Sequence, residues 1–187
     1  MDIKKAKDVM IPLSEYATVN EEDTLEKAIK TLYHSQKILS CDEYKHRAVL
    51  VFDDTGNIIG KVSPLDVLRA IEPKYSQFGR SDYLGKMGLS RFGLSTDFLH
   101  SLIENYSLWD ESCDTLVKKA KKRKVKEIMS TQQEGEYVDE DISVPEAVHQ
   151  FILGQHQSLL VLKNDKVVGI LRLCDIFKLI CDLIVEE

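Results

Sequence analysis

The chain has 187 residues, of which 43% are hydrophobic and 30% are charged, a composition that is ordinary for a globular protein with one large domain or two small ones. Its formal net charge of −6 argues against nucleic acid as the main partner, because phosphate binding needs an excess of Lys and Arg. No run approaches the roughly 18 apolar residues of a membrane helix, and the start lacks the apolar block of a signal peptide, so we expect a cytoplasmic protein with no membrane partner.

Residues 1–72 are predicted to form a unit with the order helix, strand, turn, strand, helix. Apolar residues recur at helical spacing over 25–32, and a capping-box pair formed by Asp23 and Glu26 marks the start of that helix. Two short apolar runs rich in strand-forming residues then flank the turn sequence DDTGN. A second helix is expected over 65–71.

Residues 73–123 have no counterpart elsewhere in the chain and are predicted to be an insert. The first part is loop-like, with glycines among aromatic residues, and the second part has the pattern of two helices. Their apolar stripes consist of Phe98, Leu102, Ile103 and Tyr106 in one helix and Leu116, Val117 and Ala120 in the other. Because the insert holds the only tryptophan, Trp109, and enough apolar surface to dock, we expect a helical subdomain.

Residues 124–187 repeat the first unit. The segments 8–33 and 127–152 align without a gap, which places Met10 on Met129, and strand runs, a turn and a final helix follow in the same order. A unit of about 60 residues has too small an interior to be stable alone. The sequence therefore predicts an α/β fold in which two pseudo-symmetric repeats pack together.

Each repeat closes with a related stretch, GKVSPLDVL in the first and GILRLCDIF in the second. The seventh position is aspartate in both, Asp66 and Asp175, whereas the fourth is Ser63 in one and Arg172 in the other. SPLD is a good helix start without any ligand, because Ser favours the N-cap and Pro the first helical position. A carboxylate there can also accept hydrogen bonds from two neighbouring hydroxyl groups, beside helix N–H groups that favour a phosphate.

The doubled pattern resembles the tandem CBS domain, named after cystathionine β-synthase. The resemblance lies in KDVM and KEIM at the start of the repeats, EKAI and PEAV in the helices, and the two closing stretches. It implies a regulatory or sensor module that binds an adenosine compound, such as AMP, ADP, ATP or S-adenosylmethionine, in the clefts between the repeats. It also implies a homodimer and an effector protein, as yet unidentified, that receives the signal.

The same resemblance implies roles for individual residues. Asp66 and Asp175 correspond to the aspartates that bind the ribose hydroxyls, and Ser63 to the residue that contacts ribose or phosphate. The residues expected to face them are Met129, His156 and Gln157 in the first cleft and Met10, His46 and Arg47 in the second.

Arg172 predicts that the two clefts are unequal. A guanidinium group cannot accept hydrogen bonds from helix N–H groups, but it can bind a phosphate with two parallel hydrogen bonds. The first cleft, with Ser63, therefore resembles the usual site, and the second is expected to be blocked or adapted to another ligand.

The segment 118–126 has seven cations in nine residues. Three explanations are open for it. It is a solvated face at a helix C-terminus, or it attracts the phosphate of the ligand, with Lys124 as the candidate contact, or it binds nucleic acid. A different alternative for the whole protein is a dimerisation scaffold that binds no ligand, with SPLD serving only as a helix start.

The sequence gives little indication of catalysis or of a metal. It has no HExxH, GxSxG or GxxxxGK motif, so we expect neither an enzyme nor a bound cofactor. Its four cysteines form no CxxC pair, which fits a reducing compartment and predicts no metal site. Cys174 and Cys181 are seven residues apart and are expected on one buried helical face.

Overall fold

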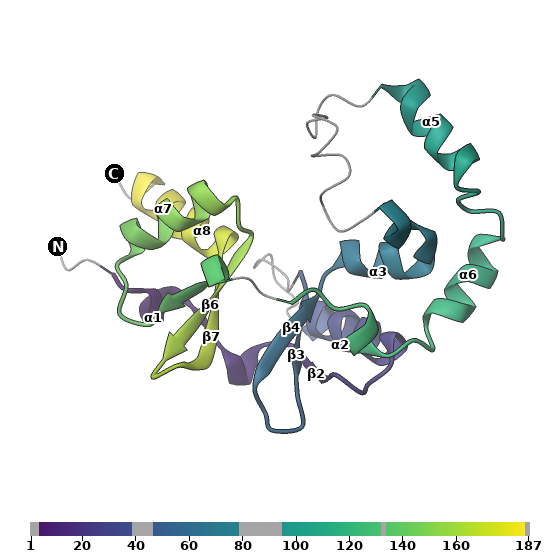
Figure 1. Cartoon of the computed structure of the whole chain (residues 1–187). Coiled ribbons are helices and arrows are strands. Elements are labelled where there is room, and N and C mark those ends of the chain that lie inside the picture. Colours follow the sequence, from purple (N-terminus) through teal and green to yellow (C-terminus); the bar gives the residue numbers. More distant parts are fainter. Residues whose placement is uncertain (1–3, 39–46, 79–94, 132–133, 186–187) are drawn as a thin grey trace.

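Two small β-sheets organise the chain, one in each of two lobes (Figure 1). The computed structural model describes residues 4–38, 47–78, 95–131 and 134–185. The strands are β1 (Ile11–Pro12), β2 (Thr18–Asn20), β3 (Val49–Phe52), β4 (Ile58–Val62), β5 (Tyr137–Asp139), β6 (Ser158–Lys163) and β7 (Lys166–Arg172). The helices are α1 (Ala6–Val9), α2 (Leu25–Ile38), α3 (Pro64–Ile71), α5 (Thr96–Asn105), α6 (Cys113–Ala120), α7 (Val144–Gly154) and α8 (Leu173–Val185). The 3-10 segments are η1 (Leu13–Glu15), η2 (Pro73–Phe78), η3 (Val125–Glu127) and η4 (Glu134–Glu136).

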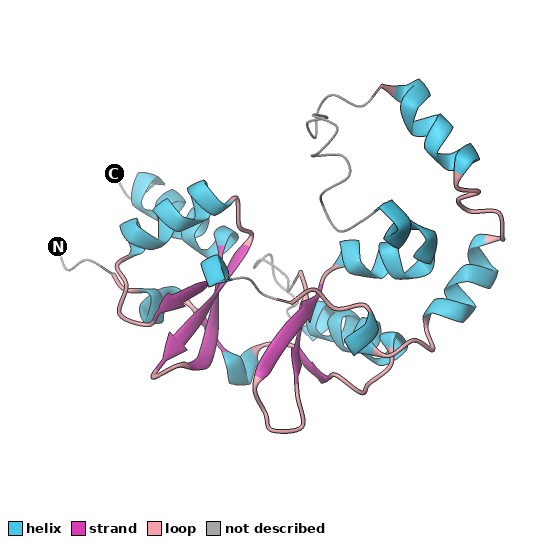
Figure 2. Cartoon of the chain, in the orientation of Figure 1, coloured by secondary structure: helices cyan, strands magenta, loops and turns pink. Residues whose placement is uncertain are grey.

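The two sheets share one topology. The first has the strand order β2-β3-β4 and the second β1-β7-β6-β5. In both repeats a parallel pair, β2 with β3 or β5 with β6, precedes an antiparallel hairpin. The hairpin register shifts at the same place in each, after Val51 and after Val161. Helices α2 and α3 pack against the first sheet and α7 and α8 against the second, which confirms the predicted α/β duplication (Figure 2).

The opening segment of each repeat packs on the other repeat. Ala6 is fully buried in the core of the second lobe, and its N–H donates to the Ile142 carbonyl at 2.9 Å. Val125, at the equivalent place, is fully buried in the core of the first lobe, and its N–H donates to the Asp23 carbonyl at 2.8 Å. Because each core includes a residue from the other repeat, neither repeat completes its interior alone.

A third apolar cluster joins the two sheets. Its buried members come from β3, β6, β7 and the turn before β2, and they are Tyr16, Leu50, Leu160 and Ile170. All four are at most 7% exposed, so water is excluded from the centre of the contact between the repeats. The pair of repeats is therefore held by its own core as well as by the exchanged segments.

The cap of α2 differs from the predicted pair of Asp23 and Glu26. The Lys27 N–H donates to the Thr24 hydroxyl at 3.3 Å, while the Asp23 carboxylate accepts the Asn20 N–H at 3.0 Å. Glu26 forms an ion pair with a lysine of the next turn instead of reaching back to the cap. Thr24 is thus the counterpart of Ser143, which caps α7 in the second repeat.

The insert is helical where the structure describes it, and the glycine-containing part, 79–94, lies outside the described residues. Leu116 and Ala120 are buried as predicted, whereas Val117 is 41% exposed and Ile103 42%. Helix α6 packs on α3, and α5 extends away from both lobes (Figure 1).

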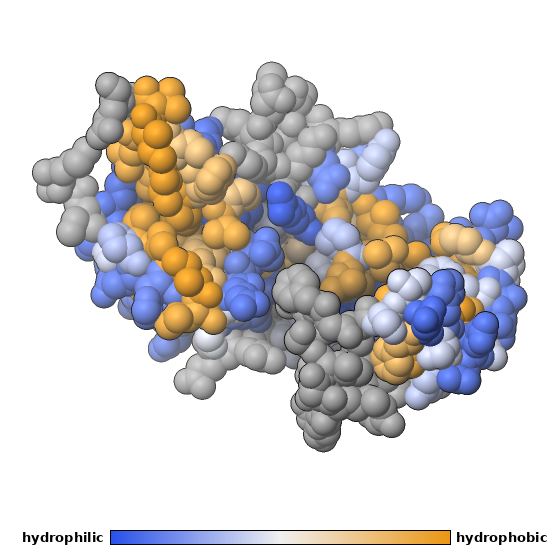
Figure 3. All heavy atoms as spheres, turned by 90° about the horizontal axis from the view of Figure 1, so that it is seen from above, coloured by the Kyte–Doolittle hydropathy of each residue, from blue (hydrophilic) through white to orange (hydrophobic). Residues whose placement is uncertain are grey.

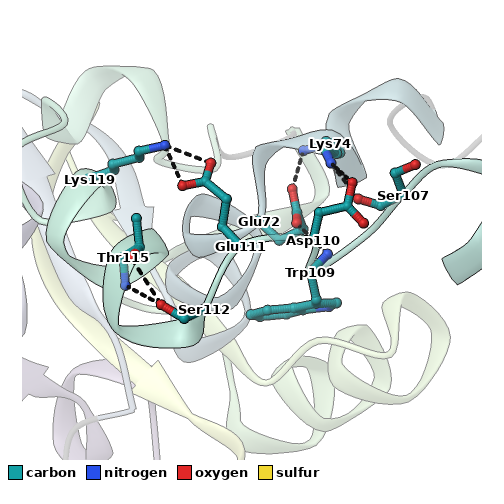
Figure 4. A network of polar contacts seen from close by, with 9 residues as sticks. All are labelled: Glu72, Lys74, Ser107, Trp109, Asp110, Glu111, Ser112, Thr115 and Lys119. Atoms are coloured by element: carbon teal, nitrogen blue, oxygen red, sulfur yellow. Dashed lines mark hydrogen bonds and ion pairs between the residues drawn. The ribbon is translucent and has the colours of Figure 1, made fainter.

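A buried carboxylate attaches the insert to the end of α3. Glu72 is 2% exposed, and its two oxygens accept the N–H groups of Trp109 at 2.7 Å and Lys74 at 3.1 Å (Figure 4). The Lys74 ammonium donates in turn to the carbonyl of Ser107. These bonds fix the turn before α6 against the first repeat.

The helices of the second lobe carry the most apolar surface. Ile152 and Leu153 of α7 are 68% and 71% exposed, and Phe177 and Ile184 of α8 are 57% and 68% exposed. This surface is the continuous hydrophobic area on the left of Figure 3. Within the described ranges no helix is long and apolar enough to cross a membrane.

Candidate functional site

The first candidate position lies where β4 turns into α3, and we call it the Ser63 corner, formed by Ser63, Asp66, Met129 and Ser130. Ser63 is the N-cap of α3, and its hydroxyl accepts the Asp66 N–H at 3.3 Å. The Asp66 carboxylate Oδ2 accepts the Ser63 N–H at 2.8 Å and the Ser63 hydroxyl at 2.6 Å. The predicted helix start is therefore present, and it buries Asp66 to 5% exposure.

The second repeat also contacts this carboxylate. The Ser130 hydroxyl donates to Asp66 Oδ1 at 2.7 Å, while the Ser130 backbone exchanges two hydrogen bonds of 2.9 Å with Lys61. The preceding residue, Met129, lies against Gly60, where an added Cβ would come within 2.7 Å of the Met129 sulfur. The structure thus brings Met129 to Gly60, at the start of the stretch that contains Ser63 and Asp66, and it adds Ser130, which sequence reasoning missed.

His156 and Gln157 lie directly before β6. The His156 ring packs over Gly154, and its Nε2 would be 3.8 Å from a Cβ placed on Gly135. The Gln157 side chain is exposed, and the backbone carbonyl of Gln157 accepts the N–H of Leu173 at 3.1 Å. Their role in binding a ligand beside Asp66 stays a prediction.

The second candidate position lies where β7 turns into α8, and we call it the Arg172 corner, formed by Arg172, Asp175, Tyr16 and Met10. The guanidinium group of Arg172 donates to both oxygens of Asp175, at 2.7 Å through Nε and 2.5 Å through Nη2. Arg172 is 8% exposed. The residue that replaces the serine cap therefore binds its own aspartate.

Tyr16 occupies the interior of the Arg172 corner. It is 7% exposed, and burial raises its pKa to about 12, an effect that the nearby Arg172 charge opposes. Its counterpart in the aligned repeats is Gly135, which has no side chain. Met10 packs on Gly169 as Met129 packs on Gly60.

Two further predicted residues belong to this side of the molecule. Arg47 is exposed, and its charge acts on Cys174, although burial dominates and raises the pKa of the Cys174 thiol. His46 lies outside the described residues. Cys174 and Cys181 are half-buried rather than fully buried, and both are free thiols.

The chemistry of the two corners differs. Asp66 accepts hydrogen bonds from two hydroxyl groups, which are the same chemical type as the vicinal hydroxyls of a ribose, so exchange of one for the other leaves the carboxylate satisfied. A ligand at Asp175 has to separate a buried, bidentate ion pair, and removing one partner of such a pair costs about 3 to 5 kcal/mol. The hydrogen bonds of Asp66 can thus be exchanged one for one, whereas those of Asp175 cannot.

The basic segment 118–126 is largely neutralised within the fold. Five of its seven cations have an ion pair or a backbone partner: Lys119, Lys121, Arg123, Lys124 and Lys126. Lys124, the predicted phosphate contact, donates to the Glu22 carbonyl at 2.6 Å. Among the residues that the structure describes, no three acidic, cysteine or histidine side chains gather in a group that could hold a metal ion.

The family model for the CBS domain matches this sequence over residues 6–73 and 125–182. The chain belongs to the CBS domain family. The two matched segments are the two repeats, each with its own corner, so the protein contains a pair of CBS domains. Among curated proteins none matches the sequence.

Solved structures of other CBS proteins share the fold. The CBS-pair protein CBSX2 from Arabidopsis thaliana superposes with a TM-score of 0.60 at 15% identity, covering 97% of each chain. CBSX2 in complex with AMP gives 0.57 at 16% identity, with 96% of this chain and 97% of that chain covered. A CBS domain-containing protein from Kribbella flavida gives 0.60 at 17% identity, with 95% and 98% covered. The predicted CBS pair is thus confirmed in sequence and in fold.

Proposed function

We propose that this CBS pair is a regulatory module that binds an adenine nucleotide at the Ser63 corner. The observation that carries the proposal is the state of Asp66, a buried carboxylate whose side-chain partners are hydroxyl groups from both repeats. The AMP complex of CBSX2, which has the same fold, supports adenosine compounds as the ligand class.

Binding exchanges one set of hydroxyls for another. The ribose diol takes the places of Ser63 and Ser130 on Asp66, in hydrogen bonds to a charged acceptor that contribute on the order of 1.5 to 3 kcal/mol each. Since Ser130 belongs to the second repeat and Asp66 to the first, the exchange removes a contact between the repeats. Occupancy can therefore shift their relative arrangement, by as much as the ligand's differential affinity for the two arrangements.

The Arg172 corner is proposed to be closed to the same ligand. Its aspartate already has a cation on both oxygens, and Tyr16 fills the place that is open at Gly135 in the other repeat. We expect one nucleotide per chain.

The remaining surfaces suggest how the module acts. The apolar surface of α7 and α8 is proposed to be covered in a homodimer, because a patch of this size is rarely left in water. The insert, attached to the far end of α3 through Glu72, is proposed as the surface for an effector protein in the cytoplasm. The role is binding rather than catalysis.

A dimerisation scaffold without a ligand is the second candidate. It is favoured by the complete capping box of Ser63 and Asp66, which satisfies the helix start in the absence of any ligand. Nucleic-acid binding is less well supported, because five of the seven cations of 118–126 are already paired.

Thermal unfolding with adenosine, AMP, ADP, ATP and S-adenosylmethionine separates these candidates. A nucleotide at 100 times its dissociation constant stabilises the folded protein by about 2.7 kcal/mol, and Asp66→Asn is expected to abolish that effect. The matched control is Glu146→Gln, because Ser143 and Glu146 form the same capping box on α7. If no adenosine compound raises the melting temperature of the wild-type protein, the scaffold is the better description.

A further inference from the structure

One half-buried ion pair crosses between the repeats beside the Ser63 corner. Lys61 of β4 contacts Glu136 of η4 at 2.5 Å, and their side chains are 22% and 15% exposed. The Lys61 backbone is bonded to Ser130, whose hydroxyl holds Asp66, and Glu136 follows Gly135, which faces the ring of His156. The pair is therefore linked through Ser130 to the aspartate of the proposed site and through Gly135 to the histidine predicted to face it.

The same place in the other half of the molecule is apolar. The counterparts of Lys61 and Glu136 in the aligned repeats are Ile170 and Ala17, which are 2% and 7% exposed. Ile170 belongs to the apolar cluster that joins the sheets. The fold can thus complete this contact without charges.

A half-buried ion pair is a weak source of stability, because desolvation of the two charges offsets much of their attraction. Replacement of such pairs by well-packed apolar residues is often neutral or stabilising. Stability therefore does not account for a lysine and a glutamate at this point of the contact between the repeats.

We propose that Lys61 determines the specificity of the site by binding the phosphate of the nucleotide. An ammonium group binds phosphate as a compact charge, and the phosphate takes the place of the Glu136 carboxylate as its partner. Glu136 holds Lys61 in the ligand-free protein and competes with the phosphate, so that the site favours ligands with a negative charge at this position. This inference rests on the proposed function and adds that nucleoside phosphates are preferred to free nucleosides.

Calorimetric titration with AMP and with adenosine tests the proposal. Lys61→Met is expected to weaken AMP binding by about tenfold or more, because one charge-assisted hydrogen bond is lost. Its affinity for adenosine is expected to stay within about threefold of the wild-type value. Lys61→Arg is expected to keep the preference for AMP, and Glu136→Gln to strengthen AMP binding by removing the competing charge.

The matched control is Lys163→Met. Lys163 is the last residue of β6, and it forms an ion pair with Glu140 at 2.8 Å. An equal loss for AMP and adenosine in Lys61→Met, or no loss for either, overturns the role of Lys61 while the proposed function stands. Wild-type protein that binds neither compound overturns both. Should Lys61→Met fail to fold, unchanged AMP affinity in Glu136→Gln refutes the competition.

Discussion

The Ser63 and Arg172 corners occupy equivalent places in two copies of one unit, yet they hold their aspartates in different ways. At the first, Asp66 is bound by a neutral cap and by a serine of the other repeat. At the second, Asp175 is bound by Arg172 from its own repeat. Two differences, Ser63 against Arg172 and Ser130 against Ile11, separate a set of hydroxyl hydrogen bonds from a bidentate ion pair.

The surroundings differ in the same sense. In the half with the Ser63 corner, Gly135 and the charged pair of Lys61 and Glu136 are all at least partly exposed. In the half with the Arg172 corner, the equivalent positions hold a buried tyrosine, alanine and isoleucine. The difference supports the proposal that the Ser63 corner binds a ligand, while the apolar residues of the other half join the repeats.

The largest expected effect follows from removing the cation of the closed corner. Arg172→Ala leaves Asp175, whose side chain is 14% exposed, without its partner, and we expect a loss of about 3 kcal/mol in the free energy of unfolding. Urea denaturation measures it, and the double variant Arg172→Ala with Asp175→Asn is expected to recover part of the loss. A loss under about 1 kcal/mol for Arg172→Ala would show that the pair is not buried as described.

Tyr16, the buried tyrosine of the Arg172 corner, predicts that the free energy of unfolding depends on pH. The pKa of Tyr16 is raised from 10.0 to about 12 in the folded protein, so the unfolded chain releases this proton at a lower pH than the folded one. The contribution of Tyr16 to the free energy of unfolding is fully present below pH 10. It is lost as the pH rises through 12, and the loss amounts to up to about 2 to 3 kcal/mol. Urea denaturation between pH 9 and 12 is expected to show this decline in the wild type and a smaller one in Tyr16→Phe.

The control for that measurement is Tyr33→Phe, because Tyr33 is 54% exposed and lies away from the corner on α2. Its free energy of unfolding is expected to decline between pH 9 and 12 as much as that of the wild type. An identical decline in Tyr16→Phe and the wild type would assign the pH dependence to other groups.

The duplication made the fold predictable from the sequence, because the same spacing of apolar residues occurs twice. Val19 and Val138 align, and both are buried, at 2% and 4% exposure, on equivalent strands. Where local signals competed, the prediction failed: Asp23 and Thr24 are both good caps, and the structure uses the threonine. The choice depends on which partner the aspartate finds nearby, and that partner is the Asn20 N–H.

The sites were less predictable, because they depend on contacts between residues far apart in the chain. The capping box of Ser63 and Asp66 is local and could be inferred from four letters of sequence. Ser130 lies 64 positions from Asp66, and only its place directly after Met129 could have indicated it. Arg172 was singled out as a group that could bind a phosphate, whereas its ion pair with Asp175 became visible only in the geometry of the turn into α8.

The smallest expected change in stability tests the exchange of hydroxyl groups at Asp66, on which the proposed binding depends. Ser130→Ala removes a hydroxyl from Asp66 and is expected to lower the free energy of unfolding by only about 1 kcal/mol, because Ser63 and the backbone still satisfy the carboxylate. If a ribose hydroxyl takes the place of Ser130 in the complex, AMP binds the variant at least as tightly as the wild type. The reason is that the two complexes then have the same bonds to Asp66, whereas the ligand-free variant is less stable than the ligand-free wild type. Parallel urea denaturation and calorimetry give both quantities, with Ser101→Ala, a serine of α5 bonded within its own helix, as the control. Weaker binding of AMP to Ser130→Ala would mean that Ser130 contacts the ligand itself, and the hydroxyl exchange at Asp66 would have to be abandoned.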